Sequence, residues 1–151
     1  MMARHARPGR VDWIGLRDAR RAPVATPQSA YLALGGFEGD HAKPGKRAVT
    51  LLQAEHLPVI AALAGLDAVS PELLRRNIVV SGLNLLGFRK ARLVIGAAEI
   101  EVTGPCPPCS RMEEALGHGG YTAMRGHGGV YAEVVRPGAV DIGARVAPAP
   151  A

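Results

Sequence analysis

The sequence predicts a β-rich α+β fold: a barrel or folded sheet of short strands with a few short helices. Short β-branched and apolar runs recur along the chain, with turn residues about every ten positions. These runs do not alternate with long helices, as they would in a doubly wound α/β fold. Hydrophobic residues make up 48% of the chain and aromatic residues 4%, so the core is expected to consist mainly of Ala, Val, Leu and Ile.

A length of 151 residues fits one domain, because typical domains run to roughly 100–150 residues. Residues 1–10 are rich in arginine and are expected to be a flexible basic tail. Residues 11–147 are expected to form the domain. Residues 148–151 end in alternating Pro and Ala and are expected to be a frayed tail, because proline cannot donate a backbone hydrogen bond.

Strand signals dominate the domain. Residues 77–81 (NIVVS) are β-branched and stop at Gly82, and Gly96-Ala97 is typical of a hairpin turn between two strands. Residues 130–135 (VYAEVV) stop at Pro137-Gly138, which is expected to be a turn. The expected strands cover residues 11–16, 29–34, 47–52, 77–81, 92–95, 99–102, 130–135 and 145–146.

Helix signals are fewer. Residues 53–64 have apolar residues at helical spacing, with Pro58 expected to break or kink the start. Residues 70–75 begin with Ser-Pro-Glu, a typical helix start. Residues 110–113 match the S-x-x-E capping box, which predicts a short helix with Ser110 as N-cap and an end near Gly117.

The formal net charge of +5 is carried more by arginine than by lysine. The planar guanidinium group suits bidentate contacts to phosphate or carboxylate, so an anionic ligand is expected. A nucleic-acid partner is disfavoured, since the sequence has no long basic helix, no aromatic-studded strand motif and no zinc-finger spacing.

The chain shows neither a signal peptide nor an apolar stretch approaching the roughly 18 residues that cross a membrane. It has two cysteines, fewer than secreted disulfide scaffolds usually carry. We therefore expect a soluble, cytoplasmic protein without a membrane partner, whose thiols stay reduced.

The most informative segment is residues 103–111, TGPCPPCSR, which three prolines and a glycine make stiff. Cys109 lies just before the expected helix start, and Arg111 adds a positive charge nearby. Both features favour a thiolate, the form that attacks electrophiles and binds metals. Cys106 lacks this placement, which makes Cys109 the candidate reactive residue.

Three other interpretations of these cysteines remain open. Both side chains could simply be small buried hydrophobes. The C-x-x-C spacing also occurs in dithiol redox pairs, although there the first cysteine begins the helix. The third interpretation is a zinc-stabilised structural module with Cys106, Cys109, His118 and His127 as ligands, although their spacing differs from common zinc fingers.

Basic and glycine-rich segments supply candidate ligand contacts. The segment 75–77, Arg-Arg-Asn, leads into the strand at 77–81. Its two guanidinium groups and its amide could bind a phosphate and the edge of a heterocycle together. The alternative is that the arginines are ordinary solvated surface residues and that Asn77 is a turn residue. Lys46 and Arg47 follow the glycine-rich segment 35–41 and either neutralise an anion or belong to a flexible loop. The glycine-rich stretch 117–129 is expected to be a mobile loop.

Taken together and in order, several segments resemble the MOSC domain, named after the C-terminal domain of molybdenum cofactor sulfurase. The resemblance covers roughly residues 11–147. The segments are GFEGDHA at 36–42, RAVTLLQAEHL at 47–57, LLRRNIVVSGLNL at 73–85, IGAAEIEVTGPCPPCSRM at 95–112 and GGVYAEVVRPGAVDIGARV at 128–146.

The resemblance implies a MOSC-type β-barrel that binds the molybdenum cofactor, molybdopterin, a pterin with a terminal phosphate. In members that act as reductases, the cysteine matching Cys109 ligates molybdenum, and residues matching Arg75 and Asn77 contact the cofactor. Lys46, Arg47 and Arg111 are expected to complete the cofactor contacts.

The first functional hypothesis is a molybdenum-dependent oxidoreductase that reduces small N-hydroxylated or N-oxide substrates. Its electrons would come from a separate donor protein, because the sequence shows no flavin, haem or iron–sulfur motif. The second is a carrier that binds the cofactor, or a persulfide on Cys109, and passes it to a client molybdoenzyme without turnover. The zinc module is the third.

Overall fold

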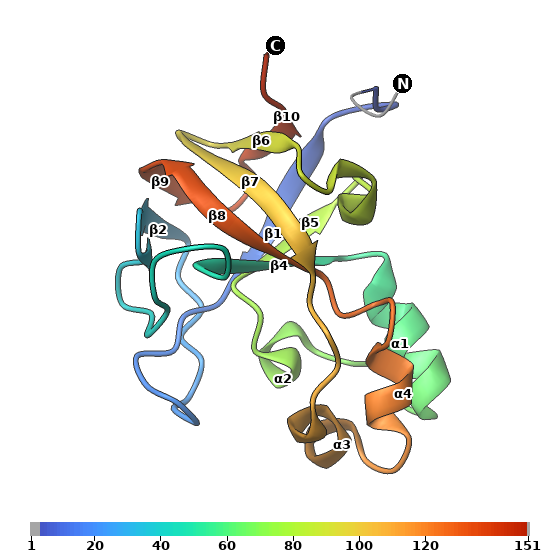
Figure 1. Ribbon diagram of the computed structural model, residues 1–151. Helices are drawn as coiled ribbons and strands as arrows, with labels where there is room; N and C mark the ends of the chain where they lie inside the picture. Colours follow the sequence, from blue (N-terminus) through green and yellow to red (C-terminus); the bar gives the residue numbers. More distant parts are fainter. Residues whose placement is uncertain (1–3, 151) are drawn as a thin grey trace.

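Seven strands form a closed barrel in the computed structural model, which describes residues 4–150. They are β1 (Gly9–Ile14), β4 (Val49–Gln53), β5 (Ile78–Ser81), β6 (Arg92–Ile95), β7 (Ala98–Pro105), β8 (Val130–Arg136) and β10 (Arg145–Pro148). Their order is β1-β10-β6-β7-β8-β4-β5, and β5 pairs back to β1. This confirms the predicted β-rich barrel (Figure 1).

A small second sheet lies beside the barrel, in the order β3-β2-β9. Its strands are β2 (Ser29–Ala33), β3 (Gly36–Phe37) and β9 (Gly138–Asp141). The turn predicted at Pro137-Gly138 is instead a corner: β8 ends at Arg136 and β9 begins at Gly138. Pro137 has no N–H, so it interrupts the hydrogen-bond ladder where the chain changes sheets.

The apolar core has two parts, and β4 and β5 contribute to both. Leu51 and Ile78 pack inside the barrel, whereas Leu52 and Val79 pack under the helices. These strands are therefore buried on both faces, which is why their sequences are continuous apolar runs. By contrast, β7 and β8 alternate buried and partly exposed residues over most of their length, since only one face is in the core.

Four α-helices and one 3₁₀ helix accompany the strands over residues 4–150. They are α1 (His56–Ala64), α2 (Pro71–Leu74), η1 (Leu85–Phe88), α3 (Ser110–Leu116) and α4 (Gly120–Met124). The α-helices lie at the end of the barrel away from both termini (Figure 1). Pro58 is in the first turn of α1, where an intrahelical N–H bond is not required, so the helix is not broken there.

The structure corrects two sequence-based expectations in this region. The stretch 117–129, expected to be a mobile loop, contains α4, whose Ala123 and Met124 are buried. Cys109, rather than Ser110, is the N-cap of α3. Glu113 does not close a capping box; its carboxylate accepts hydrogen bonds from the backbone N–H groups of Gly119 and Tyr121 instead.

Strands β4 and β5 form the one parallel pair among the paired strands of residues 4–150. A parallel pair needs a crossover connection, and α1 and α2 provide it. The crossover returns to the barrel at residues 75–77, immediately before β5. The candidate segment Arg75-Arg76-Asn77 is therefore at the base of the barrel, beside the helices.

The expected tails lie partly outside the described residues, since residues 1–3 and 151 are not described. Within the described part, β1 begins at Gly9 and β10 extends to Pro148.

Candidate functional site

The junction between α2 and β5 is bent so that its arginines reach in different directions. Arg75 ends α2 in a left-handed conformation with φ of 57°. Its carbonyl accepts a hydrogen bond from the Arg17 guanidinium group. Arg76 donates from Nε to the Gly128 carbonyl at 2.8 Å and from Nη1 to the Leu74 carbonyl at 3.0 Å. Arg76 thus ties the crossover to the segment that follows α4.

The side chain of Arg75 lacks the partners that buried donors normally have. Its Nε and Nη2 atoms are buried and make no hydrogen bond with any described residue. Buried N–H groups are nearly always satisfied, because an unpaired one costs about 1–3 kcal/mol or more when charged. The described residues therefore leave two donors of the Arg75 guanidinium group unsatisfied.

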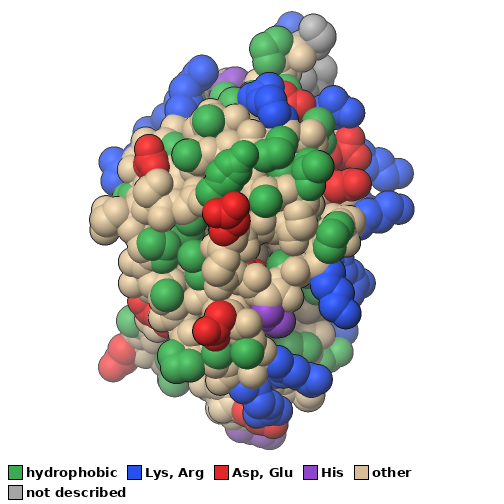
Figure 2. Space-filling model, turned by 90° about the vertical axis from the view of Figure 1, so that its left-hand side faces the viewer, with side chains coloured by type: hydrophobic (Ala, Val, Ile, Leu, Met, Phe, Trp, Pro, Cys, Tyr) green, Lys and Arg blue, Asp and Glu red, His purple; other side chains and the backbone are tan. Residues whose placement is uncertain are grey.

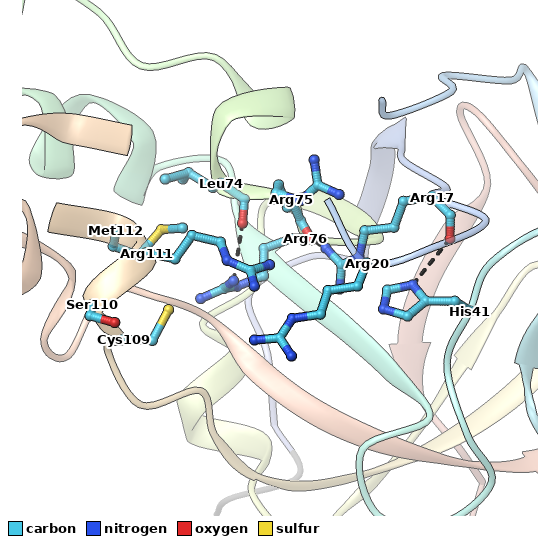
Figure 3. A pocket seen from close by; sticks show the side chains of 10 residues that line it. All are labelled: Arg17, Arg20, His41, Leu74, Arg75, Arg76, Cys109, Ser110, Arg111 and Met112. Atoms are coloured by element: carbon cyan, nitrogen blue, oxygen red, sulfur yellow. Dashed lines mark hydrogen bonds between the residues drawn. The ribbon is translucent and has the colours of Figure 1, made fainter. Parts of the chain in front are cut away.

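A cavity of about 280 Å³ opens at this junction. Five arginines line it, and among residues 4–150 no acidic side chain does. Figure 3 shows the side chains of Arg20, Arg76 and Arg111 around the same space, with the Cys109 sulfur to one side. The lining residues are Arg17, Arg20, His41, Leu74, Arg75, Arg76, Cys109, Ser110, Arg111 and Met112.

Without a bound anion, the positive charges of these arginines repel one another. Burial lowers the pKa of Arg17, and the positive charges of Arg75, Arg76 and Arg111 lower it further, against the opposing effect of Asp40. Asp40 accepts a hydrogen bond from the Arg17 backbone N–H at 2.9 Å. One nearby carboxylate cannot neutralise five guanidinium groups, so the cavity is suited to bind an anion.

Cys109 combines exposure with a fixed backbone. Its thiol is exposed at the cavity, and its carbonyl accepts the Met112 N–H at 3.0 Å in the first turn of α3. The Glu113 carboxylate, also in the first turn of α3, holds the connection to α4. Its pKa is lowered by the hydrogen bonds from the backbone N–H groups of Tyr121 and Gly119. The first turn of α3, which follows Cys109, is therefore fixed by contacts to the start of α4.

The two cysteines have opposite environments. Cys106 is 5% exposed, and burial raises the pKa of its thiol to about 11, against the lowering effects of Arg76 and Arg47. Its backbone N–H donates to the Gly129 carbonyl. Cys106 therefore fits the buried-hydrophobe interpretation, whereas Cys109 does not.

We expect a thiol reagent such as iodoacetamide to modify one cysteine in the native chain at pH 8 and two after denaturation. The reason is that Cys106 is buried and its thiol stays protonated until the pH approaches about 11. Mass spectrometry of the alkylated peptides would identify Cys109 as the native site. Rapid native labelling of Cys106 would contradict this account of the loop.

A second cavity of about 420 Å³ adjoins the first, and the two share Arg17 and His41. His41 makes a 3.2 Å contact from Nδ1 to the Arg17 carbonyl. Arg47 lies over the ring of Tyr131, with 4.7 Å between its guanidinium carbon and the ring centroid. The lining residues are Arg17, Asp40, His41, Ala42, Lys43, Pro44, Arg47, Thr50, Asn77 and Tyr131.

Asn77 mainly joins elements of the fold. It is 3% exposed, and its Oδ1 accepts hydrogen bonds from the backbone N–H and the hydroxyl of Thr50. Its Nδ2 donates to the Gly15 carbonyl at 3.1 Å. These contacts connect the ends of β1, β4 and β5 and leave little of the Asn77 amide free for a ligand.

The sequence-predicted residues divide among three places. Arg75, Cys109 and Arg111 line the first cavity, whereas Asn77 and Arg47 line the second. Lys46 lines neither; it lies farther along the surface beside Thr103, whose hydroxyl donates to the Lys46 carbonyl.

Sequence reasoning missed Arg17, Arg20 and Tyr131 as cavity residues and did not single out His41. Arg17 and Arg20 belong to the connection after β1, where nothing in the local pattern distinguishes them from surface arginines. Their cavity position follows from long-range contacts such as the one between Arg17 and the Arg75 carbonyl.

The zinc module is not assembled. Among residues 4–150 no group of three or more His, Cys, Asp and Glu side chains could hold a metal ion. Cys106 is buried and Cys109 is exposed, and both are free. His118 is fully exposed near Glu113, and His127 stacks edge-on against His56 at 5.4 Å between ring centroids. The four proposed ligands therefore do not converge.

None of the helices within residues 4–150 has both the length and the apolar character needed to span a bilayer.

In a comparison with known protein families, residues 37–147 match the MOSC domain family. No curated protein sequence matches the chain significantly.

Crystal structures with the same fold include the YuaD protein from Bacillus subtilis. It superposes with a TM-score of 0.81 at 19% sequence identity, covering 93% of this chain and 94% of that one. YiiM from Geobacillus stearothermophilus gives 0.77 at 17% identity, with coverages of 95% and 76%. YiiM from Escherichia coli gives 0.72 at 21% identity, with coverages of 94% and 70%. At these identities the likeness shows the fold.

Proposed function

The chain belongs to the MOSC domain family, and from that premise we propose that it binds the molybdenum cofactor, molybdopterin, in the arginine-lined cavity. The observation that carries the proposal is that five arginines and, among the described residues, no acidic side chain line this cavity. Phosphate is the acceptor that such a cluster binds best, because arginine meets it with paired hydrogen bonds.

The residues present fit such a group. A terminal phosphate would relieve the mutual repulsion of the arginines. The exposed thiol of Cys109 supplies a soft sulfur donor, which suits a thiophilic metal such as molybdenum. Both features line the same cavity.

Each part of the site has a distinct role in this proposal. Arg75 and Arg111 hold the phosphate-bearing end, with Arg17 and Arg20 contributing charge. Cys109 ligates the metal. Asn77 keeps the walls of the second cavity in register through Thr50 and Gly15, and Arg47 presents a positive charge from its position over Tyr131.

When bound, the cofactor would supply a metal centre that exchanges electrons with the substrate. We propose reduction of a small N-hydroxylated or N-oxide substrate as the reaction. Such a reduction takes up two electrons and two protons, breaks the N–O bond, and yields the amine and one water molecule. The electrons come from a separate donor protein. The proposed compartment is the cytoplasm, where Cys109 stays reduced.

The exposure of Cys109 favours a second candidate function. An exposed thiol on a braced helix start is accessible to another protein, as a carrier of cofactor or persulfide sulfur to a client molybdoenzyme requires. The two functions differ in turnover: a reductase converts many substrate molecules per chain, and a carrier delivers one load.

The test is to purify the wild-type chain anaerobically from a molybdenum-replete host and to measure bound molybdenum and oxidised pterin fluorescence. We expect both near one per chain. Cys109→Ala is expected to lose the molybdenum, and Arg75→Gln/Arg111→Gln to lose the pterin as well. The matched control is Cys106→Ala, which removes the buried cysteine and is expected to keep both.

Equal molybdenum content in wild type and Cys109→Ala would refute the assigned metal ligand. Absence of both molybdenum and pterin from the wild-type chain would refute cofactor binding by the isolated chain. If the cofactor is present, sustained turnover of an N-oxide with a chemical reductant distinguishes the reductase from the carrier.

A further inference from the structure

A row of basic side chains continues from the second cavity along the barrel. Arg47 and Tyr131 line both this cavity and a third hollow, and Lys46 and Thr103 join the third hollow to a fourth. We call the five exposed basic residues along this row the basic face. They are Lys43, Lys46, Arg47, Arg89 and Lys90.

No residue of the basic face forms an ion pair with another described residue. Among residues 4–150, the arginine ion pairs are those of Arg10, Arg92 and Arg136, and none involves the basic face. Figure 2 shows Lys and Arg side chains along its right-hand edge, with some Asp and Glu side chains among them, and further Lys and Arg side chains at the upper left. Unpaired like charges on one surface attract an acidic partner and speed its association.

The basic face is held in place by contacts to the barrel. The Thr103 hydroxyl donates to the Lys46 carbonyl, and the Lys90 N–H donates to the Val102 carbonyl at 2.7 Å. Arg47 rests on the ring of Tyr131. The loops that carry these charges are therefore attached to β7 and β8, and binding a partner does not require them to be ordered from a flexible state.

We propose that the basic face is a docking surface for an acidic protein. One feature favours a protein over a nucleic acid. The ring of Tyr131 in this row is covered by Arg47 and is not open for base stacking.

The position of the face relates the partner to the site. Arg47 belongs to the basic face and also lines the second cavity. The second cavity shares Arg17 and His41 with the first cavity, which Cys109 lines. A protein docked there lies beside the entrance to the site. That this partner is the electron donor rests on the proposed function; the docking itself does not.

The test uses the purified chain, whatever its metal content, and a small acidic [2Fe–2S] ferredoxin as the probe. Binding is measured by biolayer interferometry at low ionic strength and again at about 500 mM salt, where screening is strong. We expect binding at low salt that is lost at high salt. The double reversal Arg89→Glu/Lys90→Glu is expected to weaken binding about tenfold or more, mainly through slower association.

The matched control is Arg145→Glu/Arg10→Glu, which reverses two exposed arginines paired on neighbouring strands elsewhere on the barrel and changes net charge equally. Thermal melts check that both variants are folded. Equal weakening by both pairs would overturn the proposal, because net charge would then explain the binding. So would failure of the ferredoxin to bind at low salt, or tighter binding of duplex DNA of matched charge.

A chain that binds ferredoxin through the basic face but holds no molybdenum would support the docking surface and refute the proposed function. A chain that holds molybdenum but binds no ferredoxin would do the reverse.

Discussion

Replacing Gly129 with alanine is expected to destabilise the chain by about 3 kcal/mol or more, enough to unfold a marginally stable domain. Gly129 has φ of +89°, and an added Cβ would lie 2.0 Å from the Leu51 carbonyl oxygen in β4. That contact involves backbone atoms of the barrel, which cannot rotate away as a side chain can. Urea denaturation followed by circular dichroism measures the change.

The matched control for this substitution is Gly143→Ala. Gly143 has nearly the same φ, +90°, but nothing lies within 4 Å of its added Cβ. Gly143→Ala is therefore expected to lower the free energy of unfolding by about 1 kcal/mol, the cost of placing alanine at a positive φ. Equal losses for the two variants would show that conformation, and not the close approach to β4, makes Gly129 necessary. Because the Gly129 carbonyl accepts the Cys106 N–H, a shift here also displaces the cysteine loop.

Asn77→Ala is expected to lower the free energy of unfolding by about 2–4 kcal/mol, the second large effect. The substitution leaves the buried backbone N–H of Thr50 and the carbonyl of Gly15 without their side-chain partner. Unsatisfied buried groups cost more than the hydrogen bonds themselves contribute. Equilibrium urea denaturation of the metal-free chain measures this loss without any contribution from a bound cofactor.

Asn84→Ala is the control, since Asn84 is exposed and its side chain does not cap η1. It is expected to change stability by less than about 0.5 kcal/mol. A metal-free Asn77→Ala chain as stable as wild type would contradict the structural role. That result would favour the role that the family resemblance implied for Asn77, a direct contact to the cofactor.

The barrel could be predicted because its strands have strong local signals. The strands at 78–81 and 130–136 are β-branched and bounded by glycine or proline, and the family resemblance covers most of the chain. The helix details were harder to predict. In α3, the S-x-x-E pattern was present, but Glu113 bonds to Gly119 and Tyr121, which are close to it only after α4 packs against α3.

The candidate site was predictable where the residues lie close to a local signal. Cys109 and Arg75 were identified from a stiff loop and a helix end, and the structure brings both to one cavity. Arg17 was missed because it reaches the cavity through a contact 58 positions away in sequence. Lys46 and Arg47 were assigned together from the basic run after the glycine-rich segment 35–41, but adjacent residues in a loop need not face the same cavity.

The pairing of β1 with β10 also sets the order in which the protein can be completed during synthesis. Gly9 pairs with Val146 and Arg10 with Arg145, so the barrel cannot close until residues 145–148 have left the ribosome. Until then, one edge of β1 and one edge of β6 lack the neighbour that lies between them. Unpaired strand edges are prone to pair with other chains. The last four residues of the barrel therefore cover both edges, but only once they have emerged.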